Sequence, residues 1–235
     1  MVGVPLREAR VSLFDLDFVC VKCPVFSFTR LQGADPVLRV EMASTGEVAC
    51  FGSNVYDAYL KALMSTAGFT IPRRTVLFSV GPEKDKMELV EAATILSQMG
   101  YQLYGTPGTA EFFGRHGITI TALKDDRTSS DGAVSAIRQG KIDMVINVPR
   151  STDVHSCTPG YFMRRAAVDY HIPLISNTKN AALFVLSLER CRKMPRRDSV
   201  MDALSSDEPE WGDNAGDVTL EIKSWDEYLR EHAKF

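Results

Sequence analysis

Strand-like and helix-like segments alternate about five times between Thr75 and Arg190, and this alternation limits the possible folds more than any other feature. The first segment is the apolar run Thr75–Val80, which Gly81-Pro82 closes, so it predicts a buried strand. Apolar residues in the helix-like segments recur at three- and four-residue steps. Strands that alternate with helices favour parallel pairing with right-handed crossovers. We therefore predict an α/β fold with an open, doubly wound, Rossmann-like parallel sheet.

The predicted elements follow from these patterns and from the Gly and Pro residues between them. The predicted strands are 75–80, 101–104, 118–123, 142–148 and 172–175, and the predicted helices are 84–99, 106–116, 132–138, 161–170 and 180–190. An earlier helix is expected to reach Met64, with Ser53 as its N-cap and with Val55, Tyr59 and Ala62 on one face.

The two ends of the chain have a different character from this core. Residues 1–73 hold short apolar runs broken by Gly and Pro, so they are expected to be separate from the sheet domain, 74–235. Within that domain, residues 195–217 are acidic, contain prolines and offer little to bury, which predicts a mobile surface insertion. Ser224 and Glu227 have the spacing of a capping box, and Trp225 is expected to anchor the tail.

Composition excludes several classes of function. Hydrophobic residues make up 45% of the chain and the formal net charge is −3, so neither nucleic acid nor a membrane is an expected partner. The five cysteines are scattered, which favours the reducing cytoplasm over a disulfide framework. Cys20 and Cys23 have the spacing of a metal-binding pair. A strand would place them on opposite faces, so no metal site is predicted.

Polar residues are expected to meet at the carboxyl ends of the strands, where open parallel sheets bind ligands. In the turn that opens the helix 106–116, Gly108 would let a backbone approach an anion, and the new helix presents free N–H groups. An ammonium and two hydroxyls would complete a cradle for phosphate or carboxylate. The candidate residues are Lys86, Thr106, Gly108, Thr109, Lys124 and Asn147.

Each candidate also has a purely structural interpretation. Thr106 or Thr109 could cap the helix, Lys86 could be a solvated charge, and Asn147 could bond to nearby backbone. No catalytic set emerges from the four histidines or from the serines, and neither a Walker A loop nor a dinucleotide fingerprint is present.

Two stretches resemble carbamoyl-phosphate synthetase large chains. Residues 21–48, with Glu41-Met42 and Ser44-Thr45-Gly46-Glu47-Val48, resemble the end of the second ATP-grasp unit, although Cys23 stands where Glu is usual. Residues 74–190 resemble the methylglyoxal-synthase-like domain that ends these subunits. That likeness rests on the motifs Thr106-Pro107-Gly108-Thr109-Ala110, Ile142–Asn147 and Arg164-Arg165-Ala166-Ala167-Val168-Asp169, and on Lys86.

The resemblance implies the regulatory C-terminal region of an ATP-dependent ligase, a cytoplasmic carbamoyl-phosphate synthase of pyrimidine biosynthesis that hydrolyses glutamine. In that family Lys86, Thr106, Thr109 and Asn147 fall on ligand-contact positions, and Lys124 lies within one residue of another. The ATP and Mg²⁺ of the whole enzyme would bind upstream segments, so the fragment itself is expected to be non-catalytic and without cofactor. Its partners would be a small anionic effector and the rest of the synthetase, including a glutaminase subunit or domain.

Three functions remain open at this point. Leu123 stands where acetylglutamate-binding members have Trp, which favours a phosphorylated effector such as a pyrimidine nucleotide or phosphoribosyl pyrophosphate. A lyase of the methylglyoxal-synthase type is the first alternative. However, Gly81–Asp85 and Ser129-Ser130-Asp131 replace the His-Asp-His and Gly-Gly-Asp stretches of those enzymes. A structural or oligomerising module is the second alternative.

Overall fold

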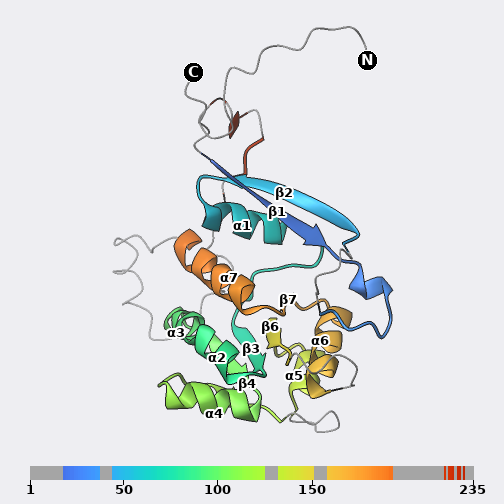
Figure 1. Cartoon of the computed structure of the whole chain (residues 1–235), viewed down its shortest axis with the longest axis vertical. Coiled ribbons are helices and arrows are strands. Elements are labelled where there is room, and N and C mark those ends of the chain that lie inside the picture. The colour runs from blue at the N-terminus through green and yellow to red at the C-terminus, as the bar shows by residue number, and fades with distance from the viewer. Residues whose placement is uncertain are drawn as a thin grey trace, which may run out of the picture.

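The computed structural model describes residues 18–37, 44–124, 132–150 and 158–192, together with 220, 222–224, 227–228 and 230. At its centre lies a five-stranded parallel sheet in the order β5-β4-β3-β6-β7 (Figure 1). Its strands are β3 (Thr75–Val80), β4 (Gln102–Gly105), β5 (Thr121–Ala122), β6 (Met144–Val148) and β7 (Leu174–Ile175). Strand order reverses between β3 and β6, so the predicted open, doubly wound parallel sheet is confirmed.

Helices cover both faces of the sheet. The helices are α1 (Val55–Met64), α2 (Glu83–Glu88), α3 (Val90–Gln98), α4 (Pro107–Arg115), α5 (Ala133–Arg138), α6 (Pro159–Asp169) and α7 (Thr178–Cys191). Val76 and Phe78 of β3 belong to a core with α3, α4 and α7, whereas Leu77 belongs to a core with α5 and α6. Because both faces of β3 are buried, its sequence is a continuous apolar run rather than an alternating one.

Three predicted elements differ from the structure, and one of them is the predicted strand 172–175, of which only β7 (Leu174–Ile175) is a strand. The predicted helix 84–99 is two helices, because the backbone at Leu89 leaves the helical region with φ −102° and ψ 0°. The fully buried Leu89 continues the apolar stripe across this break, so periodicity alone could not reveal it. The predicted strand 118–123 shortens to β5, which lies at the sheet edge and pairs with β4 only through Tyr104–Thr121 and Gly105–Ala122.

A small unit precedes the sheet. Strand β1 (Val19–Val25) pairs antiparallel with β2 (Gly46–Gly52), the short helix η2 (Phe28–Arg30) follows β1, and α1 packs against β2 and α7. Cys20 is exposed and Cys23 is buried, which confirms that they lie on opposite faces of a strand. The predicted cap Ser53 is wrong: Asn54 accepts hydrogen bonds from the backbone of Tyr56 and Asp57, since it lies one residue nearer the helix. Val55 is also exposed, so it does not share the buried face of Tyr59 and Ala62.

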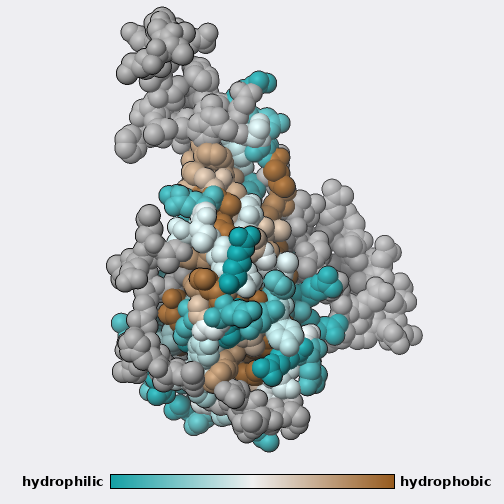
Figure 2. Space-filling model, turned by 90° about the vertical axis from the view of Figure 1, so that its right-hand side faces the viewer, coloured by the Kyte–Doolittle hydropathy of each residue, from teal (hydrophilic) through white to brown (hydrophobic). Residues whose placement is uncertain are grey.

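Figure 2 shows one face of the surface. Hydrophobic and hydrophilic residues are interspersed on the face in Figure 2. The large exposed hydrophobic residues lie on several parts of the described chain, two of them at opposite ends of α1, and are Leu31, Val55, Met64, Met87, Tyr170 and Ile222. No helix in this part of the chain has both the length and the apolar character that a membrane crossing needs.

The C-terminal tail returns to the small N-terminal unit. Ser224 and Glu227 form the predicted capping box, with Ser224 Oγ donating to Glu227 Oε2 over 2.7 Å and accepting from the Glu227 amide over 3.3 Å. The tail is anchored by Tyr228, which is 4% exposed. Trp225, the residue expected to do this, and the predicted mobile insertion 195–217 lie outside the described residues.

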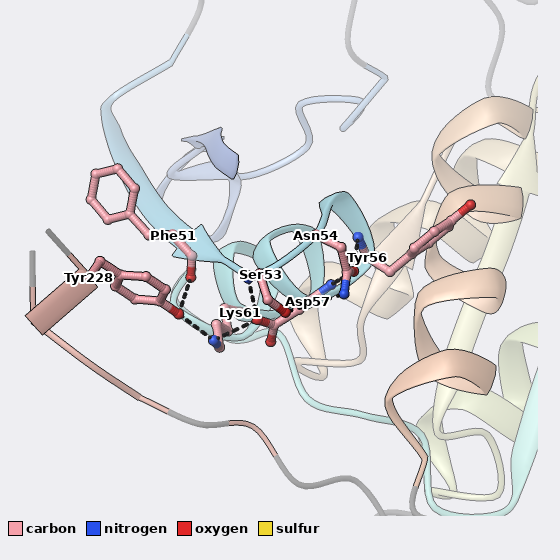
Figure 3. A network of polar contacts seen from close by, with 7 residues as sticks. All are labelled: Phe51, Ser53, Asn54, Tyr56, Asp57, Lys61 and Tyr228. Atoms are coloured by element: carbon pink, nitrogen blue, oxygen red, sulfur yellow. Dashed lines mark hydrogen bonds and ion pairs between the residues drawn. The ribbon is translucent and has the colours of Figure 1, made fainter. Parts of the chain in front are cut away.

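A buried ammonium fixes this anchor. Lys61 Nζ donates to Asp57 Oδ2 over 2.8 Å and to the Tyr228 hydroxyl over 2.9 Å, and that hydroxyl donates to the Phe51 carbonyl over 3.0 Å (Figure 3). Burial alone would lower the pKa of Lys61, but its hydrogen bonds with Asp57 and Tyr228 outweigh this effect and raise the pKa. Lys61 therefore stays charged, and the tail is held by a charge-assisted hydrogen bond.

We expect Tyr228→Phe to lower the free energy of unfolding by about 1.5–3 kcal/mol, because the buried ammonium loses a hydrogen-bond partner. Urea-induced unfolding measures this loss directly. Tyr170→Phe is the matched control, because Tyr170 is 50% exposed and should change stability by less than about 0.5 kcal/mol. Equal effects of the two substitutions would contradict the role assigned to Tyr228.

Candidate functional site

The candidate site lies where β3, β4 and β6 end at the switch point of the sheet. Helix α4 begins directly after β4, with Thr106 at the N-cap in extended conformation and Pro107 at the first helical position. Proline suits this position because the missing N–H would have no partner within the helix. The Thr106 amide donates to the Phe78 carbonyl over 3.1 Å, which joins the start of α4 to the end of β3.

Two buried hydroxyls strengthen this junction. Thr106 Oγ1 and Thr109 Oγ1 lie 2.9 Å apart, and Thr109 Oγ1 accepts from the Val80 amide over 3.2 Å. Thr106 is 8% exposed and Thr109 is 1% exposed. The Thr106 side chain makes no capping hydrogen bond, so the simple capping interpretation does not describe it. The pair instead fixes the first turn of α4 against β3.

Lys86 reaches this turn from α2. Its ammonium donates to the Gly108 carbonyl over 3.0 Å and lies 5.7 Å from the centre of the Phe112 ring. Burial lowers the pKa of Lys86, Glu83 and Glu111 raise it, and Arg150 and Arg115 lower it. Three cations and two carboxylates therefore act on this position, and burial has the largest effect.

Asn147 is contributed by β6, opposite Ser79 of β3, and is 1% exposed. Its Oδ1 accepts from Arg164 Nη1 over 2.7 Å. A guanidinium can only donate, so this bond fixes the orientation of the amide, with Oδ1 toward Arg164 and Nδ2 away from it. Nδ2 is buried and has no hydrogen-bond partner within the described part of the chain. Leaving such a donor unsatisfied costs about 1–3 kcal/mol, so it is a position for an acceptor atom of a ligand.

Two glycines keep space around these groups. A Cβ atom on Gly160, in the first turn of α6, would lie 3.1 Å from Arg164 Nη1 and 3.6 Å from Asn147 Nδ2. A Cβ atom on Gly81, after β3, would lie only 2.5 Å from Arg150 Cγ. Larger residues at either position would therefore push the polar side chains out of place.

The structure brings Lys86, Thr106, Gly108 and Thr109 into one cluster, with Asn147 on the neighbouring side of β3. Lys124 lies further along the same edge, where it is exposed and forms a backbone bridge with Gly132.

The sequence reasoning missed Arg164 and Arg150. Arg164 is part of the motif Arg164-Arg165-Ala166-Ala167-Val168-Asp169, but the sequence predicts no role for it. An arginine in a helix is normally exposed, and no local pattern marks this one as buried.

The family model of the MGS-like domain matches residues 88–176. A crystal structure of methylglyoxal synthase from Elizabethkingia anophelis NUHP1 overlaps 60% of this chain and 97% of that one, with 19% identity and a TM-score of 0.40.

Longer proteins align with most of the chain. "Multifunctional protein pyr-3" of Neurospora crassa is 48% identical over 203 residues, which are 83% of this chain and 11% of that protein. "Multifunctional protein CAD" of Squalus acanthias is 42% identical over 203 residues, or 80% of this chain and 9% of that protein. Human mitochondrial carbamoyl-phosphate synthase (ammonia) is 35% identical over 206 residues, or 83% of this chain and 13% of that protein.

The chain therefore spans about a tenth of the length of these relatives. The resemblance to carbamoyl-phosphate synthetases is confirmed: the chain contains an MGS-like domain and is related, over about four-fifths of its length, to a small part of these multifunctional proteins and synthases.

Proposed function

We propose that this chain is the regulatory region of a carbamoyl-phosphate synthase and binds a small phosphorylated effector at the carboxyl edge of its sheet. The observation that carries the proposal is the buried Nδ2 of Asn147, which has no hydrogen-bond partner among the described residues and lies at the switch point where open α/β sheets bind ligands. A phosphate oxygen would accept the hydrogen bond that this amide lacks.

Charge at the same edge favours an anion. Burial lowers the pKa of Lys86, and among its charged neighbours Arg150 and Arg115 lower it while Glu83 and Glu111 raise it, so three cations outnumber two carboxylates where the anion would bind. The N-terminus of α4, with Thr106 and Gly108, adds backbone N–H groups and the positive end of a helix dipole. Lys124 could reach a larger ligand that extends along the edge toward β5.

The relatives suggest the context of this binding. A pyrimidine nucleotide or phosphoribosyl pyrophosphate would regulate a cytoplasmic, glutamine-hydrolysing enzyme of pyrimidine biosynthesis, whose ATP and Mg²⁺ bind other segments. Residues 1–73 would be the end of an ATP-grasp unit, 74–235 the effector domain, and a glutaminase subunit or domain a further partner. The effector acts only if it binds two states of the enzyme with different affinity.

A thermal-shift screen tests the proposal with UTP, phosphoribosyl pyrophosphate, acetylglutamate and dihydroxyacetone phosphate. A ligand that binds only the folded chain adds about 2.7 kcal/mol of stability at a hundred times its dissociation constant. We expect a phosphorylated effector to raise the melting temperature and acetylglutamate to leave it unchanged. Turnover of dihydroxyacetone phosphate would favour a lyase instead, and no response to any of the anions would favour a structural module.

We expect Lys86→Met to weaken binding of the phosphorylated effector about tenfold or more, because a charge-assisted contact contributes about 1.5–3 kcal/mol. Lys84→Met is the matched control, since it removes the same charge from an exposed position of the same helix. Isothermal titration calorimetry of both variants makes the comparison. If both substitutions change the affinity equally, Lys86 contributes only to the general charge.

Thr109→Val should lower the free energy of unfolding by about 1–3 kcal/mol, because the buried Val80 amide and the Thr106 hydroxyl each lose a partner. Thr109→Ser keeps the hydroxyl and should restore most of this stability. Chemical denaturation of the two variants gives the difference. A valine variant as stable as the serine variant would show that the hydroxyl does not hold α4 against β3.

A further inference from the structure

Arg164 joins the candidate site to a segment far away in the sequence. It is 1% exposed, and one edge of its guanidinium holds Asn147 through the 2.7 Å bond from Nη1 to Oδ1. The other edge grips the carboxylate of Asp35, with 2.7 Å from Nε to Oδ1 and 2.6 Å from Nη2 to Oδ2. Asp35 lies 129 residues earlier in the chain. One buried cation therefore contacts the ligand-facing amide and the small N-terminal unit at the same time.

Other contacts dock the same segment, residues 28–35, on α6 without reaching Asn147. Arg165 Nη1 donates to the carbonyl groups of Phe28, Leu31 and Ala34 at 2.9–3.2 Å. The hydroxyl of Tyr161 donates to the carbonyl of Gly33 over 2.8 Å. The contacts of Arg165 and Tyr161 therefore provide controls, because removing them loosens docking of residues 28–35 without changing a contact to Asn147.

We propose that Arg164 is a positioning residue that couples anion binding at Asn147 to docking of residues 28–35 through Asp35. The inference rests on the proposed function, because it assigns a route of regulation to the same site. Arg164 orients the Asn147 amide so that Nδ2 faces the ligand, and the same guanidinium also binds the carboxylate of Asp35.

The sign of the coupling follows from charge. Asp35, whose side chain is 32% exposed, and an anion at Asn147 would lie on opposite sides of the buried Arg164 guanidinium, where they repel each other and share its positive charge. Anion binding therefore weakens the grip of Arg164 on Asp35, and docking of the segment weakens anion binding. By linkage the two effects on affinity are equal in size.

Titration of the complete chain with UTP tests this sign. We expect Asp35→Asn to tighten UTP binding about threefold or more, as is usual for partners in one hydrogen-bonded network. Asp169→Asn is the matched control, because it removes a carboxylate that pairs with Arg165 instead, and it should leave the affinity unchanged. Arg164→Gln should weaken binding and abolish the effect of Asp35→Asn in the double variant. Equal effects of Asp35→Asn and Asp169→Asn would overturn the proposal.

A second measurement does not depend on a ligand. The side-chain NH₂ signals of Asn147 can be followed by NMR with ¹⁵N-asparagine and assigned by their loss in Asn147→Ala. We expect Asp35→Asn to shift them, whereas Tyr161→Phe, which loosens the same segment without touching Arg164, leaves them in place. If UTP fails to bind but these shifts occur, the proposed effector is wrong and the link through Arg164 stands. Signals that do not respond to Asp35→Asn refute the link even if UTP binds.

Discussion

The carboxyl end of β3 is the constraint on which the rest of the structure depends. Its residues are buried on both faces, so each remaining backbone group must find a partner within the protein. The Phe78 carbonyl accepts a hydrogen bond from the Thr106 amide, and the Val80 amide donates one to Thr109 Oγ1. Ser79 lies opposite Asn147 of β6. The same hydrogen bonds that complete the strand therefore position the candidate site. A change at this end of β3 alters stability and ligand geometry together.

Buried cations join the parts of the chain around this centre. Lys61 connects α1 with the tail, and Arg164 and Arg165 connect α6 with the segment after β1. Burying such charges is costly unless each is paired and fully hydrogen-bonded, and these three have several partners each. The contacts contribute less to net stability than their number implies. They do favour one arrangement of the small unit and the sheet domain, because the three buried cations would lose their hydrogen-bond partners in any other arrangement.

The sequence predicted what depends on local pattern. Strand β3 was predicted with its observed limits, because a run that is apolar on both faces and ends at Gly81-Pro82 is typical of a buried central strand. Thr106-Pro107 likewise marked the start of α4. The break at Leu89 and the cap at Asn54 depend on backbone details that apolar periodicity does not encode. The roles of Arg164 and Asp35 could not be predicted at all, since each acquires its partner only through the tertiary fold.

The aromatic contact of Tyr228 with the strand pair β1–β2 has a mechanical consequence. The ring of Tyr228 lies 5.8 Å from that of Phe18 and 6.0 Å from that of Phe51, so the Tyr228 side chain packs against the strand pair β1–β2. Tension applied through Phe18 and Tyr228 would load this aromatic contact and the Lys61 hydrogen bond, while the parallel sheet lies outside the line of force.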